Sequence, residues 1–543
     1  MRKLLLGVGL FLATSAVACA SPQAPGGAGS GSTEPKQGGR LNVTFRVDPI
    51  DHDPTYNGKT VPGDAALAQV YDSLLGFKSG PNIEFTDMQL APRLAERWEV
   101  SPDSKSFTFH MRKGVKYASL PPVNGRELTA DDVKWTFQYF NRLGDEFKSL
   151  PPASHVGTMF EGLESVDAPD RNTVVVKFKD SFIPFLAYTA SQWNVILPKE
   201  IYEKEKSFKD TMVGTGPFQF DASETRKSSV WAWKRNPTHW DAANTYVDEI
   251  RWLLLSEDST IQAAFKTKQV DILGSPLGDI SYTQVKSGNP QAQFFPTLQP
   301  QSYHLHFSQV KPGPLTDVRV RRALAMAIDR EEINKVAAGG EGKWGVPAMP
   351  GLFTDAEVKA MQKQDVEAAK KLLAEAGYTG SNTIKLNWPI ESDLSQEDLN
   401  WFLLVQAQFK RIGVEVNLDR MDKNAQRAKR RIGDFDIDVI QGLGLLEADI
   451  DSTLFGTYHS RGATNWPKVR DAELDKLLQA QRAEADPEKR KGIQKDAVKR
   501  IIDQAHGVDL IYPPIWYAAQ GYVKNYTPHF SVRGPWTNAW LDK

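Results

Sequence analysis

Short runs of alternating apolar and polar residues dominate the first half of the chain. Alternation over residues 41–45 and 174–178 predicts two strands, because side chains along a strand point to opposite faces in turn. Residues 98–100 and 107–111 alternate in the same way on either side of the turn Pro102-Asp103-Ser104. This arrangement predicts a β-hairpin.

One helix start stands out among these strands. Thr129 is followed three residues later by Asp132, which is the spacing of a capping box. We therefore expect a helix over residues 133–140. Trp231 and Trp233, further along, are expected in the core.

Helical periodicity is the main pattern of the second half. Apolar residues recur at helical spacing over 320–328, 366–376 and 399–409, whereas 414–418 and 435–439 alternate as strands do. Helices that alternate with strands predict an α/β domain with a partly parallel sheet. The change of character places a domain boundary between residues 297 and 303. The aromatic-rich tail 511–543 lacks helical periodicity, so we expect it to return to the first domain.

The N-terminus carries the only cysteine of the 543 residues, Cys19. A charged start, the apolar run 4–17 and small residues before Cys19 predict a signal peptide over residues 1–18. Ala16-Val17-Ala18-Cys19 resembles a bacterial lipobox, in which the cysteine carries the lipid anchor. The alternative is an ordinary secretory signal that is cut after Ala18 or Ala20, with Cys19 incidental.

Composition narrows the class of protein. Residues 19–39 are rich in Gly, Ser and Pro and predict a flexible tether. The remaining length suits several folded domains, and no later segment is apolar enough to span a bilayer. With a net charge of −1 and no long basic block, the chain has no positive electrostatic field that would attract nucleic acid. With one cysteine no intramolecular disulfide forms, so the fold depends on its apolar core.

Several blocks in order resemble the large extracellular solute-binding proteins that serve ABC importers of peptides, nickel chelates and oligosaccharides. The resemblance covers residues 38 to 530. The blocks are Leu94-Ala95-Glu96-Arg97-Trp98-Glu99-Val100-Ser101, Met111-Arg112-Lys113-Gly114-Val115-Lys116-Tyr117, Leu128-Thr129-Ala130-Asp131-Asp132-Val133, Gly214-Thr215-Gly216-Pro217-Phe218, residues 234–240, residues 318–330 and residues 368–378.

The resemblance implies an α/β, two-lobed periplasmic-binding-protein fold of the large type, with the ligand cleft between the lobes. Lobe I is expected over residues 40–298, with an extra subdomain at about 72–212. Lobe II is expected over 299–508, and residues 509–543 are expected to return to lobe I.

The sequence offers no catalytic motif: it lacks Gly-x-Ser-x-Gly, His-Glu-x-x-His and a Walker loop. We therefore expect no enzyme and no cofactor. His304 and His306 fall on one face of a predicted strand, a spacing that suits a metal, but no third ligand is near. No metal site is predicted.

The segment 442–451 is the most informative for ligand recognition. Peptide-binding relatives carry Gly-Trp here and an aspartate three residues after the tryptophan, which pairs with the peptide's ammonium group. In this chain Leu443 and Leu446 stand at those positions. Glu447, Asp449 or Asp451 are candidates to substitute for the aspartate, and the alternative is that these acids cap and solvate a loop.

Other candidate ligand residues lie in predicted loops of lobe II. Trp344, Tyr458 and Trp466 offer aromatic faces that stack on a sugar ring or a side chain. Arg461 suits a ligand carboxylate. Asn465 stands where relatives often have an asparagine near the cleft.

These features predict a monomeric, exported receptor, held to the outer face of the membrane or in the periplasm by its lipid anchor alone. It is expected to capture an oligopeptide or similar solute by hinge closure and to deliver it to ABC permease subunits. A receptor for an oligosaccharide or another non-peptide solute is the first alternative. A non-transport lipoprotein chaperone or sensor on the same fold is the second.

Overall fold

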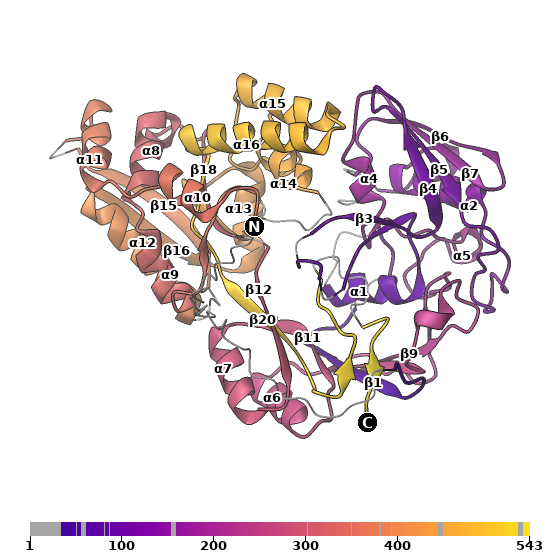
Figure 1. Cartoon of the computed structure of the whole chain (residues 1–543). Coiled ribbons are helices and arrows are strands. Elements are labelled where there is room, and N and C mark those ends of the chain that lie inside the picture. Colours follow the sequence, from indigo (N-terminus) through magenta and orange to yellow (C-terminus); the bar gives the residue numbers. More distant parts are fainter. Residues whose placement is uncertain are drawn as a thin grey trace, which may run out of the picture.

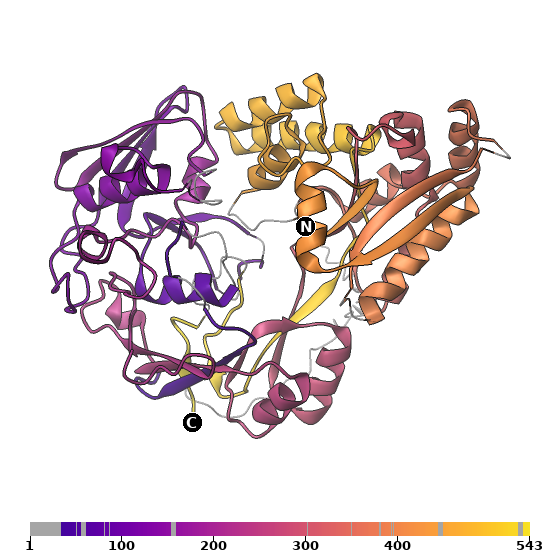
Figure 2. The same cartoon turned by 180° about the vertical axis from the view of Figure 1, so that it is seen from behind.

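The computed structural model describes residues 34–543 except 50–51, 56–60, 81, 86, 152, 154–158, 301, 349, 380–381, 393, 395, 444–448 and 530–535. The molecule consists of two lobes that stand side by side (Figure 1), and the view from behind shows the same division (Figure 2). This is the two-lobed α/β fold that the sequence predicted.

Lobe I is built on a mixed sheet that contains seven strands in the described part of the chain, in the order β12-β20-β11-β1-β10-β9-β8. Its central strand β1 is parallel to β10, with Val43 opposite Trp252. Leu41, Val43 and Phe45 are buried on the strand as the alternation predicted. The strands are β1 (Arg40–Phe45), β8 (Phe218–Phe220), β9 (Val230–Arg235), β10 (Glu249–Leu254), β11 (Ile272–Leu277), β12 (Gln293–Leu298) and β20 (Pro514–Ala519).

A separate antiparallel sheet, β4-β5-β7-β6, forms the upper part of lobe I in Figure 1. The predicted hairpin is present as β4 and β5, and Val100 lies opposite Phe107. The remaining elements of lobe I are β2 (Leu75–Phe77), β3 (Leu90–Pro92), β4 (Ala95–Val100), β5 (Ser106–Met111), β6 (Leu163–Asp170), β7 (Thr173–Phe178), β21 (Val523–Lys524), β22 (Trp540–Leu541), α1 (Val61–Val70), α2 (Ala130–Asn141), α4 (Phe185–Tyr188), α5 (Lys199–Glu205), α6 (Asp258–Lys266) and α7 (Asp279–Gly288).

Lobe II combines the sheet β17-β13-β18 with the parallel pair β15-β16, and helices cover both. The strands are β13 (Ser302–Phe307), β14 (Lys343–Trp344), β15 (Ile384–Glu391), β16 (Val414–Met421), β17 (Ile437–Leu443), β18 (Gly507–Asp509) and β19 (Ile511–Tyr512). The helices are α8 (Val318–Ala327), α9 (Arg330–Ala338), α10 (Asp355–Met361), α11 (Val366–Glu375), α12 (Gln396–Arg411), α13 (Lys423–Ile432), α14 (Asp451–Tyr458), α15 (Ala472–Ala483) and α16 (Pro487–Asp503).

The lobes are connected where the chain crosses between them. It leaves lobe I after Leu298, the end of β12, and returns after Tyr512 to form β20. The return falls later than the expected start at residue 509, because β18 and β19 still pair within lobe II. The amide of Gln299 donates to the carbonyl oxygen of Pro513 over 2.8 Å, so the crossings are hydrogen-bonded to each other.

Each lobe has its own core. Among the described residues, the buried clusters around Trp252 and Phe265 belong to lobe I, and those around Trp401 and Leu454 belong to lobe II. Because these clusters do not continue from one lobe to the other, the lobes can move relative to each other without exposing a core. In the part of the chain described here, no helix has the length and apolar character of a membrane span.

Candidate functional site

A large hollow between the lobes lies beside the crossing strands. It has a volume of about 790 Å³, within the range of about 300–1,000 Å³ that is common for ligand pockets. Lobe I lines it with residues 82–85, the edge strand β12 and residues 514, 516, 527 and 528, and lobe II contributes Glu341, Lys343, Pro350 and Gly351. Both lobes therefore contribute to this pocket, as a closing receptor requires.

Aromatic rings and a few charges give this interlobe pocket its character. Phe85, Phe294 and Phe295 supply apolar surface. Glu84 from lobe I and Glu341 from lobe II add negative charges to the lining, and Lys343 from lobe II adds a positive one. An apolar lining with a few polar groups is the usual composition of a site for a small organic solute.

Trp344 lies beside this pocket, in strand β14 and not in a loop as expected. β14 pairs with β19, where Trp344 is opposite Ile511. Trp344 lines an adjoining hollow of about 500 Å³ in lobe II, which shares Lys343 and Leu298 with the interlobe pocket. The ammonium of Lys359 is 5.4 Å from the indole centroid. Trp344 thus remains a prediction as a ligand residue, at a position next to the shared pocket.

Asp449 and Asp451 are both held by arginines of lobe II. Arg490 donates to the two carboxylate oxygens of Asp449 over 2.7 and 2.8 Å. Arg482 does the same for Asp451 over 2.8 and 2.9 Å, and Gln481 adds a further bond. The Asp451 side chain has an exposed fraction of 0%. These carboxylates therefore already have positive partners.

The buried carboxylates raise the pKa of the two arginines that they face. Burial by itself lowers the pKa of the Arg482 guanidinium, but the Asp451 carboxylate more than offsets it, so the pKa lies above its ordinary value. Glu161 of lobe I reinforces this effect. The same balance of burial and a facing Asp449 raises the pKa of Arg490. Both arginines are thus charged at neutral pH.

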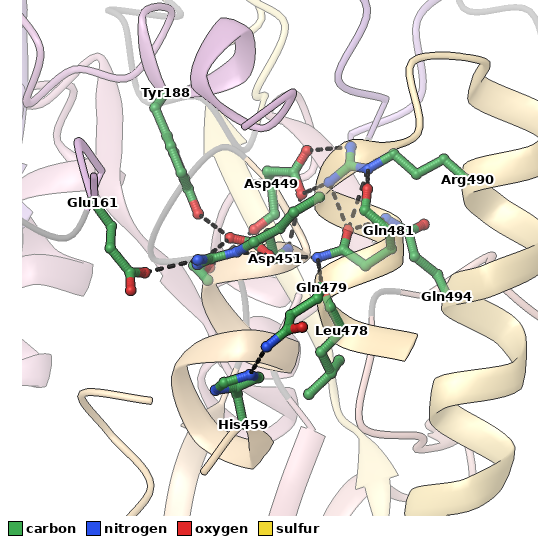
Figure 3. Close-up of polar contacts among 12 residues, drawn as sticks. Glu161, Tyr188, Asp449, Asp451, His459, Leu478, Gln479, Gln481, Arg490 and Gln494 are labelled. Atoms are coloured by element: carbon green, nitrogen blue, oxygen red, sulfur yellow. Dashed lines mark hydrogen bonds and ion pairs between the residues drawn. The ribbon is translucent and has the colours of Figure 1, made fainter. Parts of the chain in front are cut away.

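The contact between Asp451 and Tyr188 joins the two lobes. The Tyr188 hydroxyl, on α4 of lobe I, donates to Asp451 Oδ2 over 3.2 Å. Figure 3 shows Glu161 and Tyr188 approaching the Asp449 and Asp451 region from the other lobe. Glu161, Tyr188 and Arg482 are absent from the residues predicted from the sequence, because partners 263 positions apart (Tyr188 and Asp451) leave no local pattern.

Arg461 lines a third hollow, of about 500 Å³, which also lies between the lobes. Lobe I supplies Lys105 and Asp180 to this hollow, and lobe II supplies Phe455 and Gln479. Arg461 is therefore placed at an interlobe surface, but on the side of α14 and α15 and apart from the pocket at the crossing strands.

Tyr458 is the last residue of helix α14, not a loop residue, and it is fully buried in lobe II. Its hydroxyl lies 3.1 Å from His304 Nε2. On the other side of the ring, His304 Nδ1 lies 3.0 Å from the Asp509 carboxylate. Burial raises the pKa of the Tyr458 hydroxyl well above its usual value. In this conformation the residue is part of a polar network inside the lobe.

Asn465 and Trp466 lie in the loop after α14. The Asn465 side chain is buried and bonds the backbone of His459 and Val469, so it fixes the loop. The guanidinium of Arg430 is 5.5 Å from the Trp466 ring. Neither residue lines the interlobe pocket.

Cys19 and Glu447 lie outside the described residues. His306, beside His304 on β13, is fully buried, and the described part of the chain contains no group of three metal-ligating side chains.

Two lobes with separate cores, joined by crossings and enclosing a pocket lined from both sides, define a hinged binding protein. The chain belongs to the bacterial extracellular solute-binding proteins, family 5, whose middle region matches residues 89–465. It is 28% identical over 489 residues to the dipeptide-binding protein of Escherichia coli (strain K12), covering 85% of this chain and 87% of that protein.

Other relatives have different names. The chain is 26% identical to heme-binding protein A of Haemophilus influenzae, with 85% of this chain and 86% of that protein covered. The structure of the ABC transporter-associated periplasmic binding protein DppA from Helicobacter pylori in complex with the peptide STSA superimposes with a TM-score of 0.77. It is 23% identical and covers 94% of this chain and 99% of that one. The chain is thus a solute-binding protein of the ABC importer class and not an enzyme.

Proposed function

We propose that this protein is the lipid-anchored, extracytoplasmic receptor of an ABC importer and that it captures a peptide-like solute between its lobes. The observation that supports this most directly is the pocket of about 790 Å³ lined by both lobes at the crossing strands. A solute that contacts both lobes binds the closed state more tightly than the open one, and so it drives closure. The closed lobes then present a joint surface to the permease.

The peptide assignment rests on the relatives. The Escherichia coli relative is named as a dipeptide-binding protein, and the superimposed Helicobacter pylori structure contains a peptide. The pocket has room for a short peptide among its aromatic and charged walls. Glu84 of lobe I and Glu341 of lobe II, both in the lining, suit an ammonium group or a basic side chain.

A non-peptide solute is the second candidate, and the state of the acids after strand β17 favours it. Asp449 and Asp451 are occupied by Arg490 and Arg482, so neither carboxylate is free to pair with a peptide's ammonium group. Heme-binding protein A shows that a relative of comparable identity is named for a different ligand. A further alternative is a chaperone or sensor that does not engage a permease.

The identity of the solute is tested by mass spectrometry of what the freshly purified protein releases on denaturation. Peptides of a few residues support the proposal, and a sugar, chelate or other compound supports the second candidate. The released compound, added back, should reduce the radius of gyration in small-angle scattering. Absence of compaction by every released compound contradicts the receptor function.

The location of the site is tested with a matched pair of lysine variants. Lys343→Met alters the lobe II wall of the interlobe pocket, whereas Lys335→Met alters an exposed lysine on α9 away from it. We expect the first variant, and not the second, to weaken binding of the released compound in isothermal titration calorimetry. Equal affinity for both variants contradicts the placement of the ligand in this pocket.

A further inference from the structure

Lobe I and lobe II touch a second time, at the end of the molecule away from the hinge. Helix α4 of lobe I approaches α14 and α15 of lobe II, whereas β12 and β20 cross between the lobes lower in the view (Figure 1). The contacts here are polar. Arg482 Nη1 donates to Glu161 Oε2 over 2.7 Å, and Tyr188 donates to Asp451. The amide of Ile183 also donates to the carbonyl oxygen of Arg482 over 2.9 Å.

Arg482 is fixed before it meets lobe I. Its guanidinium makes a bidentate pair with Asp451 and lies 3.2 Å from the ring centroid of Phe455, both within lobe II. The ring centroid of Phe182, in lobe I, lies 5.0 Å from the same guanidinium. A guanidinium that is already positioned loses little conformational entropy when Glu161 arrives.

We propose that Glu161, Tyr188, Asp451 and Arg482 form a clasp that holds the lobes closed and is released when they open. The inference deepens the proposed receptor function and rests on it. Contacts far from a hinge separate most when the lobes rotate, so these contacts are lost even on a small opening. The ligand and the clasp then stabilise the same closed state, and the clasp acts without touching the ligand.

The charges make the clasp reversible. On opening, Arg482 keeps its pairing with the buried Asp451, so no charge is left unpaired inside lobe II. Glu161, whose side chain is already 44% exposed, returns to water at low cost. Solvent screening keeps the Glu161 contact weak. We expect Glu161 and Tyr188 each to shift the open–closed equilibrium about fivefold, which is typical of one hydrogen bond.

The test uses the solute-free full chain in a Cys19→Ser background, which contains no other cysteine. Cysteines introduced at the exposed positions Lys113 and Lys489, one in each lobe, carry spin labels for distance measurement by electron resonance. The clasp variants are Glu161→Gln and Tyr188→Phe. These changes are close in shape to the native side chains and leave the Asp451–Arg482 pair intact.

A matched control is Glu164→Gln, an exposed glutamate of strand β6, three residues after Glu161, without a described contact to lobe II. We expect each clasp variant to move several-fold more of the molecules to the long inter-label distance, and the control to match the wild type. About 1 M NaCl should open the wild type in the same direction as Glu161→Gln, because salt screens the ion pair. Thermal unfolding should remain close to that of the wild type and so verify folding.

Distance distributions that are the same in the wild type and both clasp variants overturn the clasp. This result does not depend on any ligand. If the clasp variants open the lobes but no solute is ever released or bound, the clasp stands and the receptor function fails. If a solute compacts the protein and the clasp variants bind it with unchanged affinity, the receptor function stands and the clasp fails.

Discussion

His306 makes the stability of lobe II sensitive to acid. Its side chain is fully buried on β13, next to His304 at a ring separation of 4.5 Å, and neither ring nitrogen has a described hydrogen-bond partner. Burial, with smaller contributions from His304 and Arg430, holds the pKa of His306 well below its usual value of 6.5. Protonation of His306 is therefore disfavoured while lobe II is folded.

The direction in which pH changes the stability depends on whether the folded or the unfolded chain binds the proton. Because the folded pKa of this base is lowered, the contribution is complete above the unfolded pKa of 6.5 and declines as the pH falls. Below that value the unfolded chain binds a proton that the folded chain does not bind. The free energy of unfolding therefore falls by about 1.4 kcal/mol per pH unit. Between pH 6.5 and about pH 5 the loss of unfolding free energy from His306 alone is about 2 kcal/mol.

His306→Leu tests this. The variant should lose about 2 kcal/mol less stability than the wild type between neutral pH and about pH 5, measured by urea unfolding at each pH. Val439→Ala on β17 is a suitable control, because it truncates a buried residue of lobe II without changing a titratable group. It should lower stability equally at both pH values. If His306→Leu retains the full pH dependence of the wild type, the ring is protonated in the folded protein and the reasoning is refuted.

Further predictions concern glycines, an ion pair and the N-terminus. Gly214→Ala should lose about 3 kcal/mol or more in thermal unfolding, because its Cβ would overlap a backbone carbonyl oxygen of α1, whereas Gly492→Ala on α16 meets only open space and should gain about 0.5–1 kcal/mol. Arg490→Met leaves the nearly buried Asp449 without its ion-pair partner and should lower the free energy of unfolding in urea by about 3 kcal/mol. Adding Asp449→Asn should restore most of this loss. If it restores none, Arg490 stabilises the lobe through packing and not through its charge. In a cell without an outer membrane, Cys19→Ala should move the protein from the membrane fraction to the medium; retention in the membrane fraction contradicts lipidation.

Local elements were predictable because their causes are local. The Thr129 amide donates to Asp132 over 2.8 Å, so the capping box that indicated the start of α2 is present. Trp231 and Trp233 are buried, as expected for strand β9. Alternation and helical periodicity report which face of an element is buried, and burial is a property of the element itself.

The clasp and the carboxylates it uses could not be predicted in this way. In the sequence, Asp451 is only an acid near a predicted ligand loop. Tyr188 and Arg482 come into contact with it only in the folded chain. A buried carboxylate must acquire a positive partner, but the sequence does not show whether that partner is a ligand or an arginine of the same chain.

The arginine partners change what the missing aspartate at position 446 implies. If Asp449 and Asp451 were free, either one could replace it and bind an ammonium group. Because Arg490 and Arg482 neutralise them, a carboxylate for that purpose must come from elsewhere, and Glu84 and Glu341 on the walls of the interlobe pocket are the described candidates. A peptide bound through those glutamates would lie close to the crossing strands. Ligand contact and clasp would then act at opposite ends of the lobes, and each would stabilise the closed state independently.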